Sequence, residues 1–282
     1  MEKKTFNFVR GEFLPFSAVN KSRQRLDGRK HLQEIIVMLR ALVGIASLTL
    51  IILLPWQAQA YEVAAVADGG GVSGKVLFQG TPPPPAKLLI TKDHEPCGKG
   101  QIERQEVDVK DGVLRGVVVY LDNVEKGKAF PKEAASPIVD QKKCQFVPYL
   151  QVVQDGAKIT ILNSDPVLHN IHAYELIGSA HRSMFNIAQP KVKPKVAQTV
   201  RVQRGNVVRI ECDAHNWMLG WLFVAKNPYY AVVGEDGSFR IDEIPPGTYT
   251  LTAVHPVLGA EKTNVEVKAK GSASVSFTFS GK

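Results

Sequence analysis

Residues 206–223 read NVVRIECDAHNWMLGWLF. An apolar strand pattern ends at Cys212, a short loop carries His215 and Met218, and a second apolar run begins at Leu219. Short runs rich in Val, Ile and aromatic residues, separated by polar loop residues, are typical of β-strands. This stretch therefore predicts a strand, a tight loop and a second strand, with three side chains on the loop that can bind a metal.

Short apolar runs bounded by Gly, Asp, Asn or Pro recur on both sides of this stretch. No amphipathic helix of useful length is expected after residue 60. Regularly spaced short strands predict an all-β protein built as a sandwich or barrel. Strands are expected at Val72–Gln79, Ala86–Thr91, Val113–Leu121, Leu150–Val153, Lys158–Leu162, Ala197–Gln203, Val207–Cys212 and Gly220–Ala225.

The composition is that of an ordinary folded protein, with 282 residues of which 44% are hydrophobic and 22% charged. The formal net charge is +8, but the first 60 residues contain nine basic and four acidic side chains. Residues 61–282 contain 26 Lys and Arg against 23 Asp and Glu, which is only +3. Because this excess is small and forms no basic run, nucleic acid is not expected as a partner.

The basic leader over residues 1–60 contains the features of a secretion signal. Ala41–Leu54 is an uninterrupted run of apolar and small residues, too short for a membrane span, and Ala58-Gln59-Ala60 fits a signal cleavage site. We expect cleavage after Ala60, export to the periplasm or the medium, and no membrane span afterwards. An uncleaved N-terminal anchor is the alternative, and Met38 is a candidate for the true initiator.

The chain after the leader contains three cysteines, Cys97, Cys144 and Cys212. An odd number in an oxidising compartment leaves one thiol over. Cys97 and Cys144 lie in turn-like and strand-edge contexts without His at ligand spacing, whereas Cys212 has His215 nearby. The context therefore predicts a Cys97–Cys144 disulfide and a free Cys212.

A thiolate, an imidazole and a thioether on one loop suit copper, because sulfur ligands stabilise Cu(I) and imidazole suits both oxidation states. Oxygen-preferring Mg²⁺ and Ca²⁺ would not select these donors. A trigonal site needs a second imidazole, and His169 supplies one just after an expected strand. His172 is the alternative. A zinc site built from Cys212, His215 and both of these histidines is the chemical alternative to copper.

These residues and their spacing are similar to the cupredoxins. The similarity consists of His169-Asn170-Ile171 after a strand end and, 43 residues beyond His169, of Cys212-x-x-His215-x-x-Met218, with the short loop of the amicyanin type. It covers residues 131–225 and implies a Greek-key β-sandwich that holds one copper ion. The implied roles are equatorial ligation by His169, Cys212 and His215, weak axial ligation by Met218, and hydrogen bonding between the two ligand loops by Asn170.

The last part of the chain resembles a different β-sandwich. Asp236-Gly237-Ser238-Phe239 and Pro245-Pro246-Gly247-Thr248-Tyr249 resemble the carboxypeptidase regulatory-like (prealbumin-like) family, which implies a smaller accessory module at residues 226–282. Such a module needs more strands than this segment provides. Strands from the N-terminal β segment, residues 61–130, would complete it, and residues 131–225 would then be an insertion.

The resemblance implies outer-sphere electron transfer with redox proteins of the periplasm as partners, and no enzymatic activity. A Cys/His hydrolase is disfavoured, because the thiol lies on a β-loop rather than at a helix N-terminus. The competing interpretation is a module that holds or delivers copper, or a non-redox binding or structural sandwich. The polar stretch 174–196 is expected to cover the site or meet a partner, and His181 and His255 are expected to be solvated.

Overall fold

The computed structural model describes residues 32–38 and 61–281, and the chain separates into two compact units, Met1–Ala58 and Gln59–Lys282. In the first unit, residues 32–38 form a helix with exposed side chains. The predicted signal segment and its cleavage site lie outside the described residues. Among the helices that the structure describes, none is long and apolar enough to cross a membrane.

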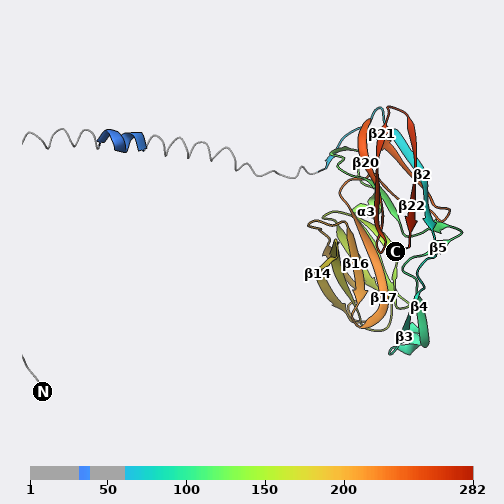
Figure 1. Cartoon of the computed structure of the whole chain (residues 1–282). Helices are drawn as coiled ribbons and strands as arrows, with labels where there is room; N and C mark the ends of the chain where they lie inside the picture. Colours follow the sequence, from blue (N-terminus) through green and yellow to red (C-terminus); the bar gives the residue numbers. More distant parts are fainter. Residues whose placement is uncertain (1–31, 39–60, 282) are drawn as a thin grey trace, which may run out of the picture. The chain divides into compact units, whose positions relative to one another are not determined.

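The second unit is all-β, as predicted, and contains two β-sandwiches (Figure 1). One, here called the outer sandwich, pairs a sheet in the order β18-β7-β20-β21 with a sheet in the order β19-β2-β6-β5, to which β22 adds beside β2. A short pair, β1 and β8, accompanies it. Its strands are β1 (Glu62–Val63), β2 (Gly70–Gln79), β5 (Val109–Lys110), β6 (Val113–Leu114), β7 (Val118–Leu121), β8 (Lys126–Gly127), β18 (Tyr230–Val232), β19 (Ser238–Ile244), β20 (Gly247–His255), β21 (Gly259–Val267) and β22 (Ser272–Ser280).

Strands from both ends of the described chain form the outer sandwich. β2 pairs in parallel with β22 over nine residues, from Gly71 opposite Ser272 to Gln79 opposite Ser280, and β7 pairs with β20. One buried apolar core joins them, since Val72 and Leu121 belong to the same cluster as Phe277. The chain between β8 and β18 is therefore inserted into this sandwich.

The insertion forms the second sandwich, here called the inserted sandwich. Its two sheets have the strand orders β10-β9-β12-β15 and β11-β17-β16-β13-β14. The short helix α3 precedes its first strand. Its elements are α3 (Lys132–Ala135), β9 (Ile138–Lys142), β10 (Gln145–Val147), β11 (Leu150–Gln154), β12 (Lys158–Asn163), β13 (His169–Ile177), β14 (Ala180–Gln189), β15 (Lys195–Thr199), β16 (Val207–Cys212) and β17 (His215–Ala225).

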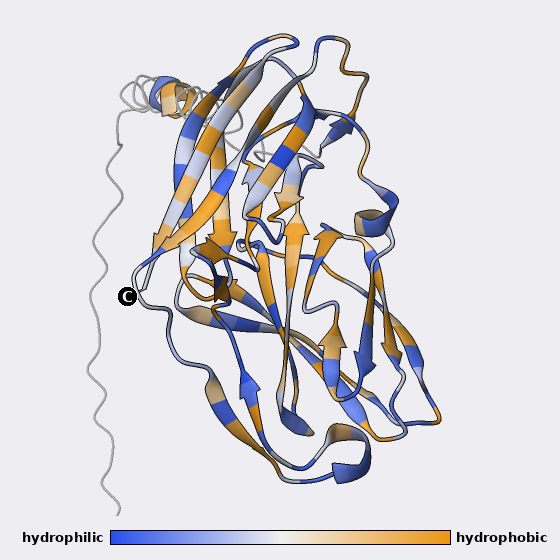
Figure 2. Cartoon of the chain, turned by 90° about the vertical axis from the view of Figure 1, so that its right-hand side faces the viewer, coloured by the Kyte–Doolittle hydropathy of each residue, from blue (hydrophilic) through white to orange (hydrophobic). Residues whose placement is uncertain are grey.

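The position of β17 explains why its sequence, residues 215–225, is apolar almost without interruption. It lies between β11 and β16, and its two faces contact different cores. Met218 and Leu222 pack into the core of the inserted sandwich, whereas Leu219 and Phe223 pack into a cluster shared with the outer sandwich. A strand buried on both faces needs apolar residues at every position. Most other strands alternate apolar with polar residues, as Figure 2 shows.

A third element lies outside both sandwiches. β3 (Ala86–Ile90) and β4 (Gly100–Arg104) pair antiparallel as a two-stranded sheet, with the one-turn helix α2 (His94–Cys97) between them. We call residues 86–104 the arm. Its apolar side chains, among them Leu88 and Ile102, pack against the core of the inserted sandwich.

Two expectations about local structure were wrong. The polar stretch 174–196 is not a loop, because most of it belongs to β13 and β14, which pair as an antiparallel hairpin from His169 opposite Gln189 to Ile177 opposite Ala180. Its contact with a partner stays a prediction. His255 is also not solvated. It ends the central strand β20 and is only 2% exposed, while His181 on β14 is exposed as expected.

Candidate metal centre

The ends of three strands bring the predicted ligands together. β16 ends at Cys212 and β17 begins at His215, and these two residues are register partners across a two-residue turn. β13, which begins at His169, runs antiparallel to β16, with His172 opposite Glu211. The start of β13 therefore lies beside the turn that carries the other two side chains.

His169, Cys212 and His215 form a compact buried cluster. The Nδ1 atoms of the two imidazoles are 2.9 Å apart, and the Cys212 Sγ lies 3.8 Å from Nδ1 of His169 and 3.6 Å from Nδ1 of His215. All three side chains are at most 1% exposed, and Cys212 is a free thiol. One sulfur and two ring nitrogens thus lie within 4.8 Å of one another, as a single cation would require.

A carboxylate holds the far nitrogen of each imidazole. His169 Nε2 lies 2.9 Å from Asp165 Oδ2, and His215 Nε2 lies 2.8 Å from Asp93 Oδ2. Ring N–H groups that donate to carboxylates are the usual second shell of metal-binding histidines. When both Nε2 atoms donate, both Nδ1 atoms direct lone pairs at each other and at the sulfur. Electron-pair donors that face one another in this way fit a bound cation better than a buried site without one.

Burial affects the protonation of the cluster. Burial lowers the pKa of His169, although the hydrogen bond to Asp165 opposes this shift. Burial raises the pKa of the Cys212 thiol, although the backbone N–H groups of Asn170 and His215 oppose this shift. Without a cation, burial therefore favours the neutral ring of His169 and the protonated thiol of Cys212, and a bound metal would hold the thiolate.

Asn170 connects the two ligand loops. Its backbone N–H donates to Cys212 Sγ at 3.4 Å, and its Oδ1 accepts hydrogen bonds from the Cys212 thiol at 3.4 Å and from the Ala214 backbone N–H at 3.1 Å. Its Nδ2 donates to Asn186 and Asp213. The contacts are those expected of a residue that fixes the geometry of a metal site.

His172 and Met218 occupy different surroundings. The ring nitrogens of His172 contact Asp213 and Ser183, and His172 does not belong to the cluster of His169, Cys212 and His215. The alternative with His172 as a ligand therefore has no support in the geometry. Met218 is 1% exposed and lies in the same apolar core as Cys212, and its axial role stays a prediction.

The predicted disulfide is present. Cys97 on the arm is bonded to Cys144 between β9 and β10, with a Cα–Cα distance of 5.1 Å. The backbone N–H of Cys144 donates to Asp165 Oδ2 at 2.8 Å, the same oxygen that contacts His169. Cys144, Asp165 and His169 also form a compact group, but the Cys144 sulfur is already used in the disulfide.

Sequence reasoning missed both carboxylates. Asp165 precedes His169 by four residues directly after β12, and this spacing is the signal that could have revealed it. Asp93 is separated from His215 by 122 residues and lies in the arm, where no motif marks it. Only the fold reveals that contact.

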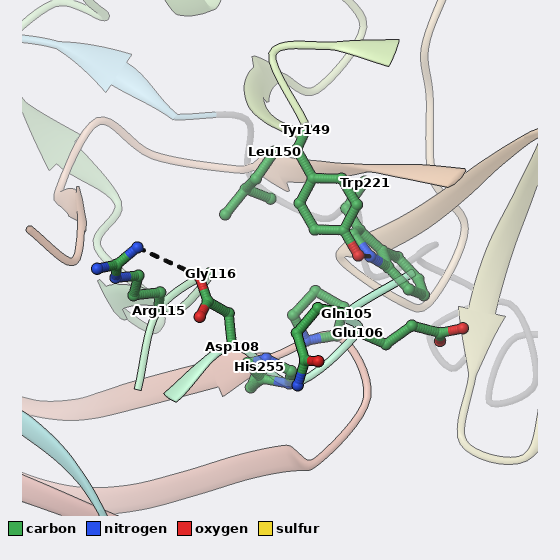
Figure 3. Close-up of a pocket in the computed structure, with 10 residues that line it drawn as sticks. Gln105, Glu106, Asp108, Arg115, Gly116, Tyr149, Leu150, Trp221 and His255 are labelled. Carbon is green, nitrogen blue, oxygen red and sulfur yellow. Dashed lines mark hydrogen bonds and ion pairs between the residues drawn. The ribbon is translucent and has the colours of Figure 1, made fainter. Parts of the chain in front are cut away.

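A separate cavity of about 320 Å³ lies where the two sandwiches and the chain after β4 meet (Figure 3). Tyr149 and Trp221 line it from the inserted sandwich, with Trp221 Nε1 donating to Tyr149 Oη at 3.1 Å. His255 lines it from the outer sandwich, and the ion pair between Asp108 and Arg115 at 3.4 Å closes one side. None of the three clustered ligands lines this cavity.

His255 predicts a dependence of stability on pH. Burial lowers its pKa from 6.5 to about 4, so the unfolded chain takes up this proton first as the pH falls. The stability that the neutral ring contributes is complete above pH 6.5 and is lost as the pH falls towards 4, by about 3 kcal/mol in total. We expect His255→Gln to flatten this part of the curve, measured by urea unfolding between pH 7 and 4. The exposed His181→Gln is the control, and equal slopes for His255→Gln and the wild type would contradict the assignment.

Comparisons with known proteins give matches over parts of the chain only. The family model described as polysaccharide lyase family 4, domain II, matches residues 199–275. Amicyanin from Paracoccus versutus is 18% identical over 34% of this chain and 84% of its own, with a TM-score of 0.27. A purple cupredoxin from Nitrosopumilus maritimus is 21% identical over 28% of this chain and 81% of its own, with a TM-score of 0.24. The copper-containing nitrite reductase of Thermus scotoductus is 13% identical over 31% of this chain and 22% of its own, with a TM-score of 0.25. No curated protein matches the sequence.

The family match does not support the expected carboxypeptidase regulatory-like assignment, because the matching model has a different description. The two motifs behind that assignment have structural roles. Asp236 Oδ1 accepts a hydrogen bond from the Ser238 backbone N–H at 3.0 Å, and Tyr249 Oη donates to the Pro245 carbonyl at 2.8 Å. Turns and corners of this kind recur in many β-sandwiches and do not separate one family from another.

Proposed function

We propose that this protein holds one copper ion at His169, Cys212 and His215, with Met218 as a weak axial ligand, and that it transfers electrons. The observation that carries this proposal is the buried cluster of one free thiol and two imidazole nitrogens at the ends of three strands. Sulfur and imidazole donors in this combination select copper over oxygen-preferring cations. A bound copper ion would supply a one-electron couple between Cu(II) and Cu(I).

The surrounding residues would keep the ligands in one arrangement during electron transfer. Asp93 and Asp165 fix the two rings, and the Asn170 backbone N–H donates to the sulfur. Ligands that are held by second-shell hydrogen bonds rearrange little when the charge of the metal changes. Little rearrangement means that an electron can enter and leave quickly.

The burial of the cluster favours electron transfer over catalysis at the metal. Metal sites that perform catalysis keep a coordination position open to water or substrate. Here each of the three ligand side chains is at most 1% exposed. We therefore propose outer-sphere transfer with no substrate bound to the metal and no enzymatic activity.

The compartment and the partners are proposals as well. Disulfides persist in oxidising compartments, so the Cys97–Cys144 bond supports the predicted export. Redox proteins of the periplasm would then be the donors and acceptors of the electrons.

The test is titration of the purified, metal-free protein with Cu(II), followed by visible and EPR spectroscopy and voltammetry. We expect one copper per chain, an intense thiolate-to-copper absorption band, a narrow hyperfine splitting and a reversible redox couple. Colourless binding of Zn²⁺ in preference to copper would contradict the copper assignment. Copper that passes to a chelating partner without redox cycling would support delivery instead.

A further inference from the structure

The arm reaches the candidate metal centre from outside both sandwiches. It forms its own two-stranded sheet, but Leu88, Ile90 and Ile102 belong to the apolar core of the inserted sandwich or pack against it. Figure 1 shows β3 and β4 below the two sandwiches, and β3 contacts β17, whose first residue His215 touches Asp93 of the arm. The arm is therefore docked beside the strand that begins with His215.

Asp93 lies at the turn where the arm meets the imidazole of His215. Its backbone adopts a left-handed conformation with φ of 51°, and its carboxylate contacts His215 Nε2 at 2.8 Å. The Asp93 side chain is 35% exposed, whereas that of His215 is fully buried. Asp93 thus lies between the imidazole and solvent, and it directs the opposite ring nitrogen, Nδ1, towards Cys212.

Two further attachments hold the arm on the ligand loops. At its C-terminal end, Arg104 Nη1 donates to the Asn216 carbonyl at 3.1 Å, one residue after His215. At its tip, the Cys97–Cys144 disulfide fixes α2 to the loop between β9 and β10. The Cys144 backbone N–H in turn donates to Asp165, the carboxylate that holds His169. The arm is therefore linked to the surroundings of both imidazoles.

We propose that Asp93 is a positioning residue for His215, and that the arm is a cover over the metal ligands which the Cys97–Cys144 disulfide locks in place. This inference rests on the proposed function, in which His215 binds the metal. A dithiol protein would unlock the cover by thiol–disulfide exchange. It would give two electrons and two protons to Cys97 and Cys144, which become thiols, and would itself become a disulfide. With the cover locked, a redox partner cannot contact the His215 ring directly.

The test measures how accessible the Cys212 thiol is in the metal-free protein. The double variant Cys97→Ser with Cys144→Ser leaves Cys212 as the only cysteine, and the probe is Ellman's reagent. We expect Cys212 to react at least tenfold faster in the double variant and in Asp93→Ala than in the wild type. Glu103→Ala, which removes an exposed carboxylate from the same arm, should react at the wild-type rate. Circular dichroism would check that each variant is folded.

A second measurement tests positioning separately from packing. Long-range ¹H–¹⁵N NMR spectra of the metal-free protein report which ring nitrogen of His215 carries the proton. We expect Nε2–H in the wild type, a mixture of tautomers in Asp93→Ala, and a largely restored Nε2–H in Asp93→Asn, whose amide oxygen still accepts a hydrogen bond. Folded variants with wild-type Cys212 reactivity and wild-type tautomer would overturn the proposal.

Both measurements use metal-free protein, so they separate this inference from the proposed function. If the protein binds no copper but Cys212 reacts faster in the arm variants as expected, the proposed function is wrong and the cover stands. If the protein binds copper as expected but Cys212 stays unreactive in every variant, the cover is wrong and the proposed function stands.

Discussion

Replacing Cys212 with serine should abolish the intense visible absorption of the copper-loaded protein. The band requires a thiolate–copper bond, and the other two cysteine sulfurs, of Cys97 and Cys144, are joined in a disulfide. A hydroxyl has the same shape as the thiol and is slightly smaller, so it disturbs the packing little, but it supplies a hard and weakly acidic donor. We also expect copper affinity to fall by more than about 100-fold, since changes in the second shell alone cost 10–100-fold. Visible absorption and competition with a copper chelator measure the two effects.

Two histidine variants serve as the comparison. His169→Ala removes a clustered ligand and should shift or eliminate the band. His172→Ala removes an imidazole of the same strand whose nitrogens contact Asp213 and Ser183, and it should leave the band unchanged. Retention of the band in Cys212→Ser would end the copper assignment. Loss of the band in His172→Ala but not in His169→Ala would reverse the choice of imidazole.

Replacing Glu175 with alanine should destabilise the protein by about 3–5 kcal/mol, because it removes a buried carboxylate that three backbone N–H groups and one arginine share. The Glu175 side chain is fully buried on β13. Its Oε1 accepts hydrogen bonds from the backbone N–H groups of Gln203, Arg204 and Gly205 at 2.7–2.9 Å, and its Oε2 pairs with Arg182. Alanine would leave all of these donors without their partner. The loop they belong to leads directly into β16, so we expect the strand that carries Cys212 to loosen as well.

The Glu175 carboxylate also predicts how the stability of the protein depends on pH in the acidic range. Burial alone would raise the pKa of Glu175, but the N–H groups of Arg204 and Gly205, together with Arg182, lower it from 4.5 to about 2. A lowered pKa means that the unfolded chain binds the proton first, so this stability is complete above pH 4.5 and is lost as the pH falls towards 2. Glu175→Gln should therefore lose less stability than the wild type over that range in urea unfolding. The exposed Glu261→Gln is the charge-matched control, and parallel curves for Glu175→Gln and the wild type would refute the assignment.

The predicted ligands came from a local signal. The spacing from Cys212 to Met218 and the His169-Asn170 pair lie within short stretches of chain, and the structure brings His169, Cys212 and His215 into one cluster. The disulfide could be predicted because Cys97 and Cys144 lie in turn-like and strand-edge contexts, away from the Cys-x-x-His-x-x-Met motif that begins at Cys212. Both predictions needed only the contexts of single residues.

The features that the sequence did not predict depend on tertiary structure. Asp93 is brought to His215 by the docking of the arm, which no periodicity encodes. β14 is polar on one face, so its alternating residues resembled a loop until pairing with β13 was known. His255 is polar by type, but its strand lies between β7 and β21 and its side chain faces the region where the two sandwiches meet, so it is only 2% exposed.

The interleaving of the two sandwiches has a consequence for synthesis on the ribosome. All strands of the inserted sandwich, β9 to β17, have been made before β18 begins, and that sandwich contains its own core. β2 is made early but must wait for β22, its partner along nine residues, which is the last strand that the structure describes. Because domains generally fold as units while the chain emerges, the domain in the middle can mature first. The unpaired edge of β2 then needs protection from aggregation until β22 has left the ribosome.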